Sequence, residues 1–297
     1  MTDNRAAAAA TGSTRPAGAS PGGAARRPGQ WIRTFHPRPG SRARLLCFPH
    51  AGGPAMAFTA LSAALPEDVE LLAVQYPGRQ DRRSEPFAES VTALARGAVD
   101  ALRARGHDDR PLFVLGHSMG SVVAFEATRI LEAEAPGAAA EGPAVVRLFV
   151  SAAAPPSAPW HRSGDGEESD EAVVRHVRWL GGVPEALLND PETVGEMVRL
   201  MRGDNEALRG YHCAAGAAVA APMTALLADD DPKNSAEETA GWSCHATGEF
   251  AVETTPGGHF ALTERDSPAA EVLTRHLRKD LHRLATAAGG DEQAGSA

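Results

Sequence analysis

The chain has 297 residues, of which 43% are hydrophobic and 23% are charged, and its net charge is −9. These proportions fit a globular protein with a sizeable core. The acidic balance argues against nucleic acid as the main partner, because neutralising phosphates requires a basic surface. No apolar run approaches the roughly 20 residues that cross a bilayer, so no membrane span is expected. Three cysteines without paired or metal-like spacing, Cys47, Cys213 and Cys244, indicate reduced thiols with packing roles in a cytoplasmic protein.

The two ends of the chain differ in composition from the rest. Residues 1–29 are rich in Ala, Gly, Pro and Arg without apolar periodicity, which is typical of a disordered leader. An organelle transit peptide is the weaker interpretation, since proline and glycine would break its amphipathic helix. Residues 287–297 are likewise predicted to form a disordered tail. One domain is therefore expected at residues 30–286.

Short apolar segments alternate with helical ones through this domain. Such alternation predicts an α/β fold with a mostly parallel sheet flanked by helices on both faces. Each predicted strand is apolar enough to be buried. The strands are Arg44 to Phe48, Leu71 to Gln75, Leu112 to Leu115, Val145 to Val150, Met223 to Leu227 and Phe250 to Thr254.

Helices are predicted from the spacing of apolar residues. Residues 91–102 place their apolar side chains on one face. The final helix is expected to begin at Ser267 as its cap, with Pro268 in its first turn. Its apolar stripe consists of Leu273, Leu277, Leu281 and Leu284.

Residues 155–221 interrupt the alternation. They contain amphipathic helical segments and no convincing strand, and the charged run Asp165 to Glu171 predicts an exposed loop. An insertion at this point would lie above an active site at the sheet edge. We therefore predict an inserted helical lid, an element that decides which substrates enter.

The strongest motif is Gly116-His117-Ser118-Met119-Gly120, which follows a predicted strand and precedes an apolar helical run. This is the context of a nucleophile elbow, in which glycines relieve crowding in a sharp turn that presents the serine. The motif predicts an α/β-hydrolase fold with Ser118 as nucleophile.

A serine nucleophile needs a histidine base and a carboxylate that orients it, in the chain order Ser, acid, His. His259 follows the last predicted strand, where the base is expected. Asp231 is the predicted acid, favoured over its two aspartate neighbours because it precedes Pro232; a solvated acidic turn is the alternative. His117 and His50 do not fit the chain order, so we assign them packing in the elbow and shaping of the pocket floor.

Two backbone amides are expected to bind the substrate oxyanion. One belongs to Met119, the residue after the nucleophile. The second is predicted to be Ala51, in the loop Phe48-Pro49-His50-Ala51-Gly52-Gly53, whose glycines let the backbone approach a ligand. The same glycines would also suit a plain strand-to-helix turn.

Together these motifs resemble one family, the discrete type II thioesterases that accompany modular polyketide synthases and nonribosomal peptide synthetases. The resemblance covers residues 31–284. The matching segments, in family order, are Trp31-Ile32-Arg33, residues 46–53, Gln75-Tyr76-Pro77-Gly78-Arg79, the elbow, Leu180-Gly181-Gly182-Val183-Pro184, Asp231-Pro232 and Gly257-Gly258-His259-Phe260.

The resemblance implies hydrolysis of aberrant or stalled acyl groups from the phosphopantetheine arm of acyl or peptidyl carrier proteins. It also implies that Asp231 is the acid and that no metal or bound cofactor is needed. A monomer is expected. The sequence departs from the family at Ala228, where Gly is usual, and at Gly203 and Asn205, where Ala and Phe are usual. The second departure predicts an altered pocket lining.

Other functions remain open on the same scaffold. A chain-releasing thioesterase, a general carboxylesterase or an acyltransferase would use the same three residues, and an inactive hydrolase that only binds carrier proteins is a further alternative. The basic stretch Arg79, Arg82 and Arg83 suits either an acidic carrier protein or ordinary structural pairing. We favour structural pairing for these arginines.

Overall fold

The computed structural model describes residues 31–106, 108–134, 145–159 and 169–294, together with Met1. A seven-stranded sheet has the order β1-β3-β2-β4-β5-β6-β7. β1 is antiparallel to β3, and the other neighbouring strands are parallel. The strands are β1 (Ile32–Arg33), β2 (Ala43–Phe48), β3 (Val69–Val74), β4 (Leu112–His117), β5 (Val145–Ser151), β6 (Met223–Ala228) and β7 (Phe250–Thr255).

All six predicted strands are present, with ends displaced by no more than two residues. β1 is too short, at two residues, to be predicted from a pattern. The prediction that every strand is buried is wrong for β7, most of whose residues are half-buried or exposed. β7 lies at the edge of the sheet and has a neighbour on one side only, so fewer of its side chains need to be apolar.

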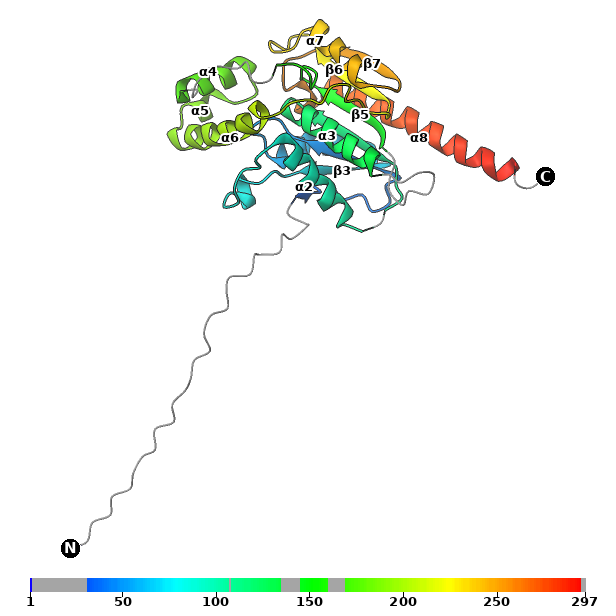
Figure 1. Cartoon of the computed structure of the whole chain (residues 1–297), viewed down its shortest axis with the longest axis horizontal. Helices are drawn as coiled ribbons and strands as arrows, with labels where there is room; N and C mark the ends of the chain where they lie inside the picture. The colour runs from blue at the N-terminus through cyan, green and yellow to red at the C-terminus, as the bar shows by residue number, and fades with distance from the viewer. Residues whose placement is uncertain (2–30, 107, 135–144, 160–168, 295–297) are drawn as a thin grey trace.

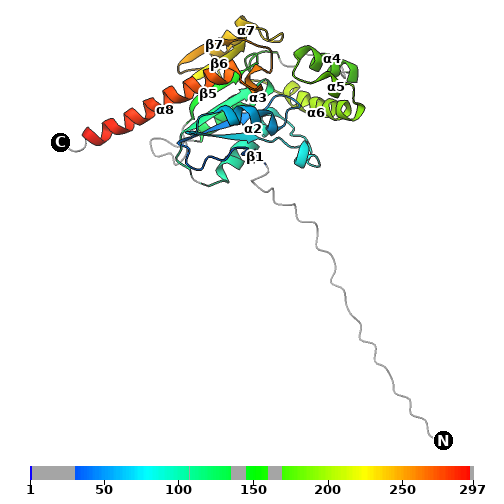
Figure 2. The ribbon, with the colours of Figure 1, turned by 180° about the vertical axis from the view of Figure 1, so that it is seen from behind.

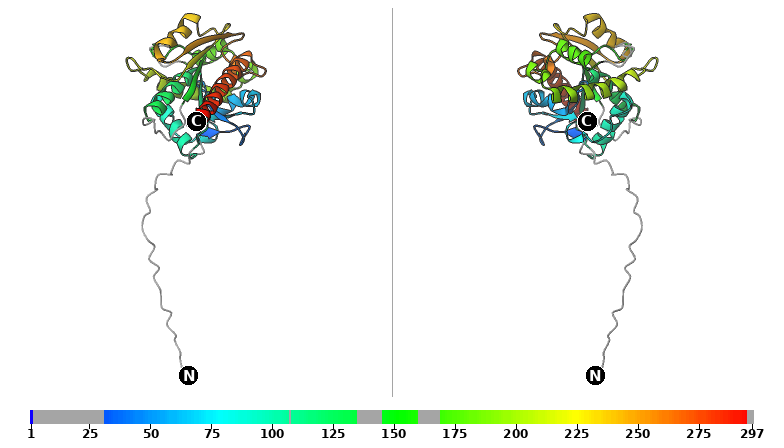
Figure 3. Two further views of the ribbon diagram at one scale, coloured as in Figure 1. Left: turned by 90° about the vertical axis from the view of Figure 1, so that its right-hand side faces the viewer. Right: turned by 90° about the vertical axis from the view of Figure 1, so that its left-hand side faces the viewer.

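Helices cover both faces of the sheet, which confirms the predicted α/β architecture (Figure 2 and Figure 3). The helices α2 (Val91–Arg103) and α3 (Met119–Ala133) pack on one face. On the opposite face lie α1 (Thr59–Ala64) and α8 (Pro268–Ala294). A short α7 (Ala236–Ala240) follows β6, and 3-10 helices lie at Ala55–Phe58, Gln80–Arg82, Gly241–His245 and Ala261–Thr263.

The final helix confirms most of its prediction. Ser267 accepts a backbone hydrogen bond at the start of α8, as a cap should. Leu273, Leu277 and Leu281 are buried against the sheet, whereas Leu284 is 38% exposed. The predicted apolar stripe is therefore wrong at Leu284. The C-terminal part of α8 leaves the body of the protein (Figure 1).

The predicted boundaries at the chain ends need one correction. α8 continues past residue 286 to Ala294, where the sequence predicts a disordered tail. The helix runs through Gly289 and Gly290 despite their low helix propensity, so these glycines do not end it. The predicted leader at residues 1–29 lies outside the described residues, apart from Met1.

The predicted lid is present between β5 and β6. It consists of α4 (Asp170–Leu180), α5 (Glu185–Leu188) and α6 (Pro191–Arg209), which lie together on the side of the molecule opposite the free end of α8 (Figure 1). Asp170 and Glu171 form the first turn of α4, so the predicted loop is wrong there; residues 165–168 lie outside the described residues. No helix in the described ranges has the length and hydropathy of a membrane span.

Candidate active site

The elbow is a strained turn between β4 and α3. Ser118 has φ 54° and ψ −123°, a region that non-glycine residues rarely occupy. A Cβ atom at Gly116 would lie 2.3 Å from the carbonyl oxygen of Gly120, and one at Gly120 would lie 2.0 Å from that of Phe48. Only glycine fits at these two positions, and the close packing holds the serine in place.

Three loops at the carboxyl ends of parallel strands bring the predicted residues together. Ser118 follows β4, Asp231 follows β6 and His259 follows β7. His259 Nε2 lies 3.1 Å from Ser118 Oγ, and His259 Nδ1 lies 3.0 Å from each carboxylate oxygen of Asp231. The side chains of His259 and Asp231 are 1% and 0% exposed. This geometry suits proton transfer from the serine to a histidine oriented by a buried carboxylate.

Asp231 is distinguished from its neighbours by its surroundings. Its carboxylate also accepts hydrogen bonds from the Lys233 amide and the Asn234 side chain, both at 2.9 Å. Burial opposes the charged form, but the hydrogen bonds from His259, Asn234 and Lys233 outweigh it and lower the pKa of Asp231 below its ordinary value. Asp229 is exposed and accepts a hydrogen bond from the Gly257 amide. The alternative of a solvated acidic turn does not describe Asp231.

The other two histidines near the serine have different environments. His117 is fully buried, with Nδ1 3.2 Å from Ser151 Oγ. His50 lines the pocket and packs edge-on against the Phe260 ring, with centroids 5.0 Å apart. Burial and the charges of nearby groups lower the pKa of His117 well below its ordinary value and the pKa of His50 to about 3. Both rings are therefore neutral near pH 7.

The loop after β2 lies beside the serine. Ala51 and Met119 line the same pocket as Ser118. The Gly53 amide donates to the His50 carbonyl at 2.9 Å, which closes a tight turn, and the Gly52 amide donates to Asp204 at 2.7 Å. The Gly52 and Gly53 amides are therefore already bonded within the protein.

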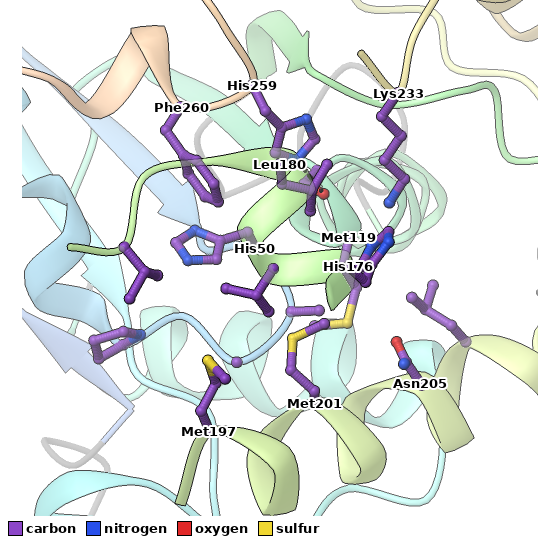
Figure 4. Close-up of a pocket in the computed structure, with 17 residues that line it drawn as sticks. His50, Met119, His176, Leu180, Met197, Met201, Asn205, Lys233, His259 and Phe260 are labelled. Atoms are coloured by element: carbon purple, nitrogen blue, oxygen red, sulfur yellow. Dashed lines mark hydrogen bonds between the residues drawn. The ribbon is translucent and has the colours of Figure 1, made fainter. Parts of the chain in front are cut away.

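A pocket of about 240 Å³ extends from Ser118 to the lid (Figure 4). Its walls are mainly apolar. Helices α4 and α6 contribute His176, Val177, Leu180, Met197, Met201, Asn205 and Leu208. Of the two positions at which a changed lining is expected, Asn205 lines this pocket and Gly203 is not among its lining residues.

Ser118, Asp231 and His259 lie together as the sequence predicts, whereas much of the pocket wall is not predicted. Lys233 lines the pocket and stands two positions after Asp231 in the sequence. This closeness to the predicted acid is enough to place Lys233 near the site from sequence alone. The wall residues His176, Met197 and Met201 carry no such signal, because their side chains reach the pocket through the packing of the lid on the body.

The basic stretch is used largely for structural pairing, as favoured. Arg79 and Arg82 are each 1% exposed. Arg79 pairs with Asp204, and Arg82 pairs with Glu85 and stacks 4.2 Å from the centroid of the Trp31 ring. Arg83 is the exposed member of the stretch and pairs with a glutamate of α6.

Comparisons with known proteins agree with this architecture. A family model described as a thioesterase domain matches residues 43–281. The chain is 40% identical over 249 residues to thioesterase PikA5 of Streptomyces venezuelae, a match that covers 84% of this chain and 86% of that protein. It is 32% identical over 251 residues to a probable cadicidin biosynthesis thioesterase of Streptomyces griseus, covering 84% and 67% of the two chains.

A solved structure is also similar. The type II thioesterase BorB from the borrelidin biosynthetic cluster matches with a TM-score of 0.70 and 38% identity, covering 83% of this chain and 97% of that one. The family model spans most of the sheet, the lid and the three loops that meet at Ser118. The chain therefore belongs to the thioesterase domain family and is a thioester hydrolase with the α/β-hydrolase fold.

Proposed function

We propose that this enzyme hydrolyses acyl thioesters on the phosphopantetheine arm of acyl or peptidyl carrier proteins. In this role it removes aberrant or stalled acyl groups during polyketide or nonribosomal peptide biosynthesis, as a monomer in the cytoplasm. The observation that carries the proposal is the hydrogen-bonded series Ser118, His259 and Asp231 at the end of an apolar pocket beneath a lid. The relatives named as biosynthetic thioesterases give it further support.

The first half of the reaction forms an acyl-serine. Ser118 Oγ attacks the thioester carbonyl carbon while its proton passes to His259 Nε2, 3.1 Å away. The tetrahedral intermediate then collapses, the carbon–sulfur bond breaks, and the departing sulfur takes the proton from His259. Asp231 stabilises the histidine cation that exists between these two transfers and fixes its Nδ1–H tautomer.

The second half releases the acid. Water attacks the acyl-serine carbonyl and gives its proton to His259 Nε2, and collapse of the second intermediate returns that proton to Ser118 Oγ. The acyl group leaves as a carboxylic acid. The carrier thiol is a product of the first half and takes no part here.

Negative charge develops on the carbonyl oxygen in both halves. We assign its binding to the backbone amides of Ala51 and Met119, which border the pocket beside Ser118. An amide donor of this kind typically contributes about 3 to 4 kcal/mol to transition-state stabilisation. Because both donors are main-chain amides, the backbone conformation around Ala51 and Met119 fixes their positions.

The pocket wall suits acyl groups of several shapes and is not built for one particular acyl group. Met197 and Met201 are flexible and polarisable, so they adapt to apolar groups of different shape. Such a wall suits removal of several kinds of stalled unit from a carrier.

The test is hydrolysis of a short acyl group from a phosphopantetheinylated carrier protein, measured beside a matched oxygen ester. We expect the wild-type enzyme to release the acyl group from the carrier and Ser118→Ala to release none above background. Turnover of the oxygen ester alone would replace the proposal with a carboxylesterase. Equal release by the two proteins would exclude Ser118 as the nucleophile.

A further inference from the structure

Two buried side chains from distant parts of the chain hold the loop that carries the Ala51 amide. Asp204, on lid helix α6, accepts a hydrogen bond from the Gly52 amide at 2.7 Å and one from Arg79 Nη2 at 2.5 Å. Arg79 Nη1 in turn donates to the Gly53 carbonyl at 2.9 Å. The side chains of Arg79 and Asp204 are 1% and 4% exposed. The loop, the body and the lid are thus joined by one ion pair.

These bonds fix successive peptide groups of the loop. The Gly53 amide donates to the His50 carbonyl, which shares a peptide plane with the Ala51 amide. Asp204 holds the next plane through the Gly52 amide, and Arg79 holds the Gly53 carbonyl. Gly52 has φ +73°, and a Cβ there would lie 3.1 Å from Met201 Sδ. The direction of the Ala51 N–H therefore depends on contacts supplied by α6 and Arg79.

The same helix touches the acyl pocket. Met201 and Leu208 lie one turn before and one turn after Asp204 on α6, and both line the pocket. Asn205 lines it as well, and Figure 4 shows Asn205 and Met201 on this helix. An acyl group that packs on this face of α6 would stabilise the helix in the position that brings Asp204 to the loop. Binding of the acyl group and placement of the Ala51 amide are then linked through one rigid element.

We infer that Asp204 and Arg79 are positioning residues for the oxyanion-binding amide of Ala51, and that the amide is in place only while lid helix α6 is seated on the body. This inference rests on the proposed role of Ala51. Substrate that fills the pocket seats the lid and completes the oxyanion site. An acyl group that fits the pocket poorly does not seat the lid, so the loop that carries the Ala51 amide is not held in place. The enzyme then distinguishes acyl groups by the rate of the chemical step.

The alternative is that the ion pair serves stability alone. Buried ion pairs are weak evidence of stabilisation in general, because desolvating the charges costs free energy that their attraction only partly returns. A purely structural pair would, when removed, lower the melting temperature and leave the kinetics of the folded fraction unchanged. The positioning role predicts a loss in kcat instead.

The principal test is Asp204→Asn, which removes the charge at nearly constant volume. We expect kcat for an acyl-pantetheine thioester to fall about 10-fold to 100-fold, somewhat less than for outright loss of an oxyanion donor, with KM changed less than about threefold. The matched control is Glu206→Gln, an exposed acidic residue on the same helix, which should keep wild-type kcat. Thermal melting of each protein establishes that it is folded.

A second measurement distinguishes a failure of the positioning role of Asp204 from a failure of the proposed carrier-protein substrate. Labelling of the nucleophile by a fluorophosphonate also places a developing negative oxygen at the oxyanion site, and it needs no thioester. We expect the labelling rate of Asp204→Asn to fall in parallel with kcat. Wild-type protein that labels but does not hydrolyse acyl carriers would refute the proposed substrate, and the labelling rates would still decide the role of Asp204.

If Asp204→Asn does not fold, Arg79→Lys provides the test. Arg79→Lys keeps a cation, but one ammonium group cannot reproduce the two-pronged contact with Asp204 and the Gly53 carbonyl. We expect a loss of kcat and labelling rate of about 10-fold. Folded variants with wild-type kcat and labelling rate, or with an effect on KM alone, would overturn the inference.

Discussion

The elbow and the lid meet at Ser118 but are built in opposite ways. At the elbow, added Cβ atoms at Gly116 and Gly120 would collide with backbone atoms. In the lid, an added Cβ at Gly182 or Gly203 would meet only the side chains of Phe260 and Phe87, and one at Gly181 or Gly195 would have no neighbouring atom within 4 Å. Ser118 is thus held by tightly packed backbone. Substrate selection is left to side chains that can change at little cost to the fold.

The largest expected effect lies in the rigid region. Asp231→Asn should lower kcat about 1,000-fold to 10,000-fold, because an amide no longer stabilises the His259 cation or fixes the productive tautomer. Steady-state kinetics with an acyl-pantetheine thioester measures the loss. Asp230→Asn, at the exposed neighbour, is the control and should keep wild-type kcat. Equal kinetics for the two variants would contradict the assignment of Asp231.

Glycine-to-alanine substitutions should have opposite effects in the two regions. Gly120→Ala should destabilise the protein by about 3 kcal/mol or more, because the new methyl group would lie 2.0 Å from the Phe48 carbonyl oxygen. Gly195→Ala, inside α6 with open space around it, should stabilise by about 0.5 to 1 kcal/mol through higher helix propensity. Urea unfolding measures the change in the free energy of unfolding for each variant. Two changes of the same sign would contradict the contrast between the elbow and the lid.

The free energy of unfolding should depend on pH through the two histidines near Ser118 that stay neutral, His50 and His117. His50 takes up a proton near pH 6.5 in the unfolded chain but only at about pH 3 in the folded protein. The unfolded state binds more protons between these values, so stability is full above pH 6.5 and falls as pH is lowered towards 3. From pH 7 to pH 5 we expect His50 to account for up to about 2 kcal/mol.

His50→Gln provides the corresponding measurement. Urea unfolding at pH 7 and pH 5 should show a smaller loss of stability for this variant than for wild type, whatever its stability at pH 7. His117 stays neutral for the same reason and contributes in the same direction. An unchanged difference between the two pH values would mean that the His50 ring is not held neutral.

A smaller effect is expected at the lid side of the pocket. Met201→Ala should lower kcat/KM for a short straight acyl group about 10-fold by removing apolar contact, while bulkier acyl groups lose less. Leu187→Ala, on an exposed side chain of the lid, should leave the acyl preference unchanged. Competition between acyl thioesters of two sizes measures that preference. A uniform loss for all acyl sizes would place Met201 outside the selecting surface.

The rigid region could be predicted from sequence because its determinants are local. The elbow is a five-residue motif after an apolar strand, and chain order then leads to His259 and the acid loop. Among the three aspartates, Pro232 and the family resemblance favour Asp231. Its extra hydrogen bonds to Asn234 and the Lys233 amide are visible only in the structure.

The lid interface could not be predicted, because its determinants are separated in the chain. Arg79 and Asp204 are 125 positions apart and neither residue alone indicates the other. Gly203 illustrates the same point: the Phe87 ring lies 2.6 Å from where its Cβ would be, which accounts for glycine at that position.

Ser118 should be the nucleophile at the end of an acyl-binding pocket. The most direct test is fluorophosphonate labelling followed by peptide mass spectrometry, with and without an excess of acyl-pantetheine thioester. We predict one phosphonyl adduct, on the peptide containing Ser118, formed more slowly when the thioester is present. An adduct on another residue, no adduct, or labelling that the thioester does not slow would contradict the account.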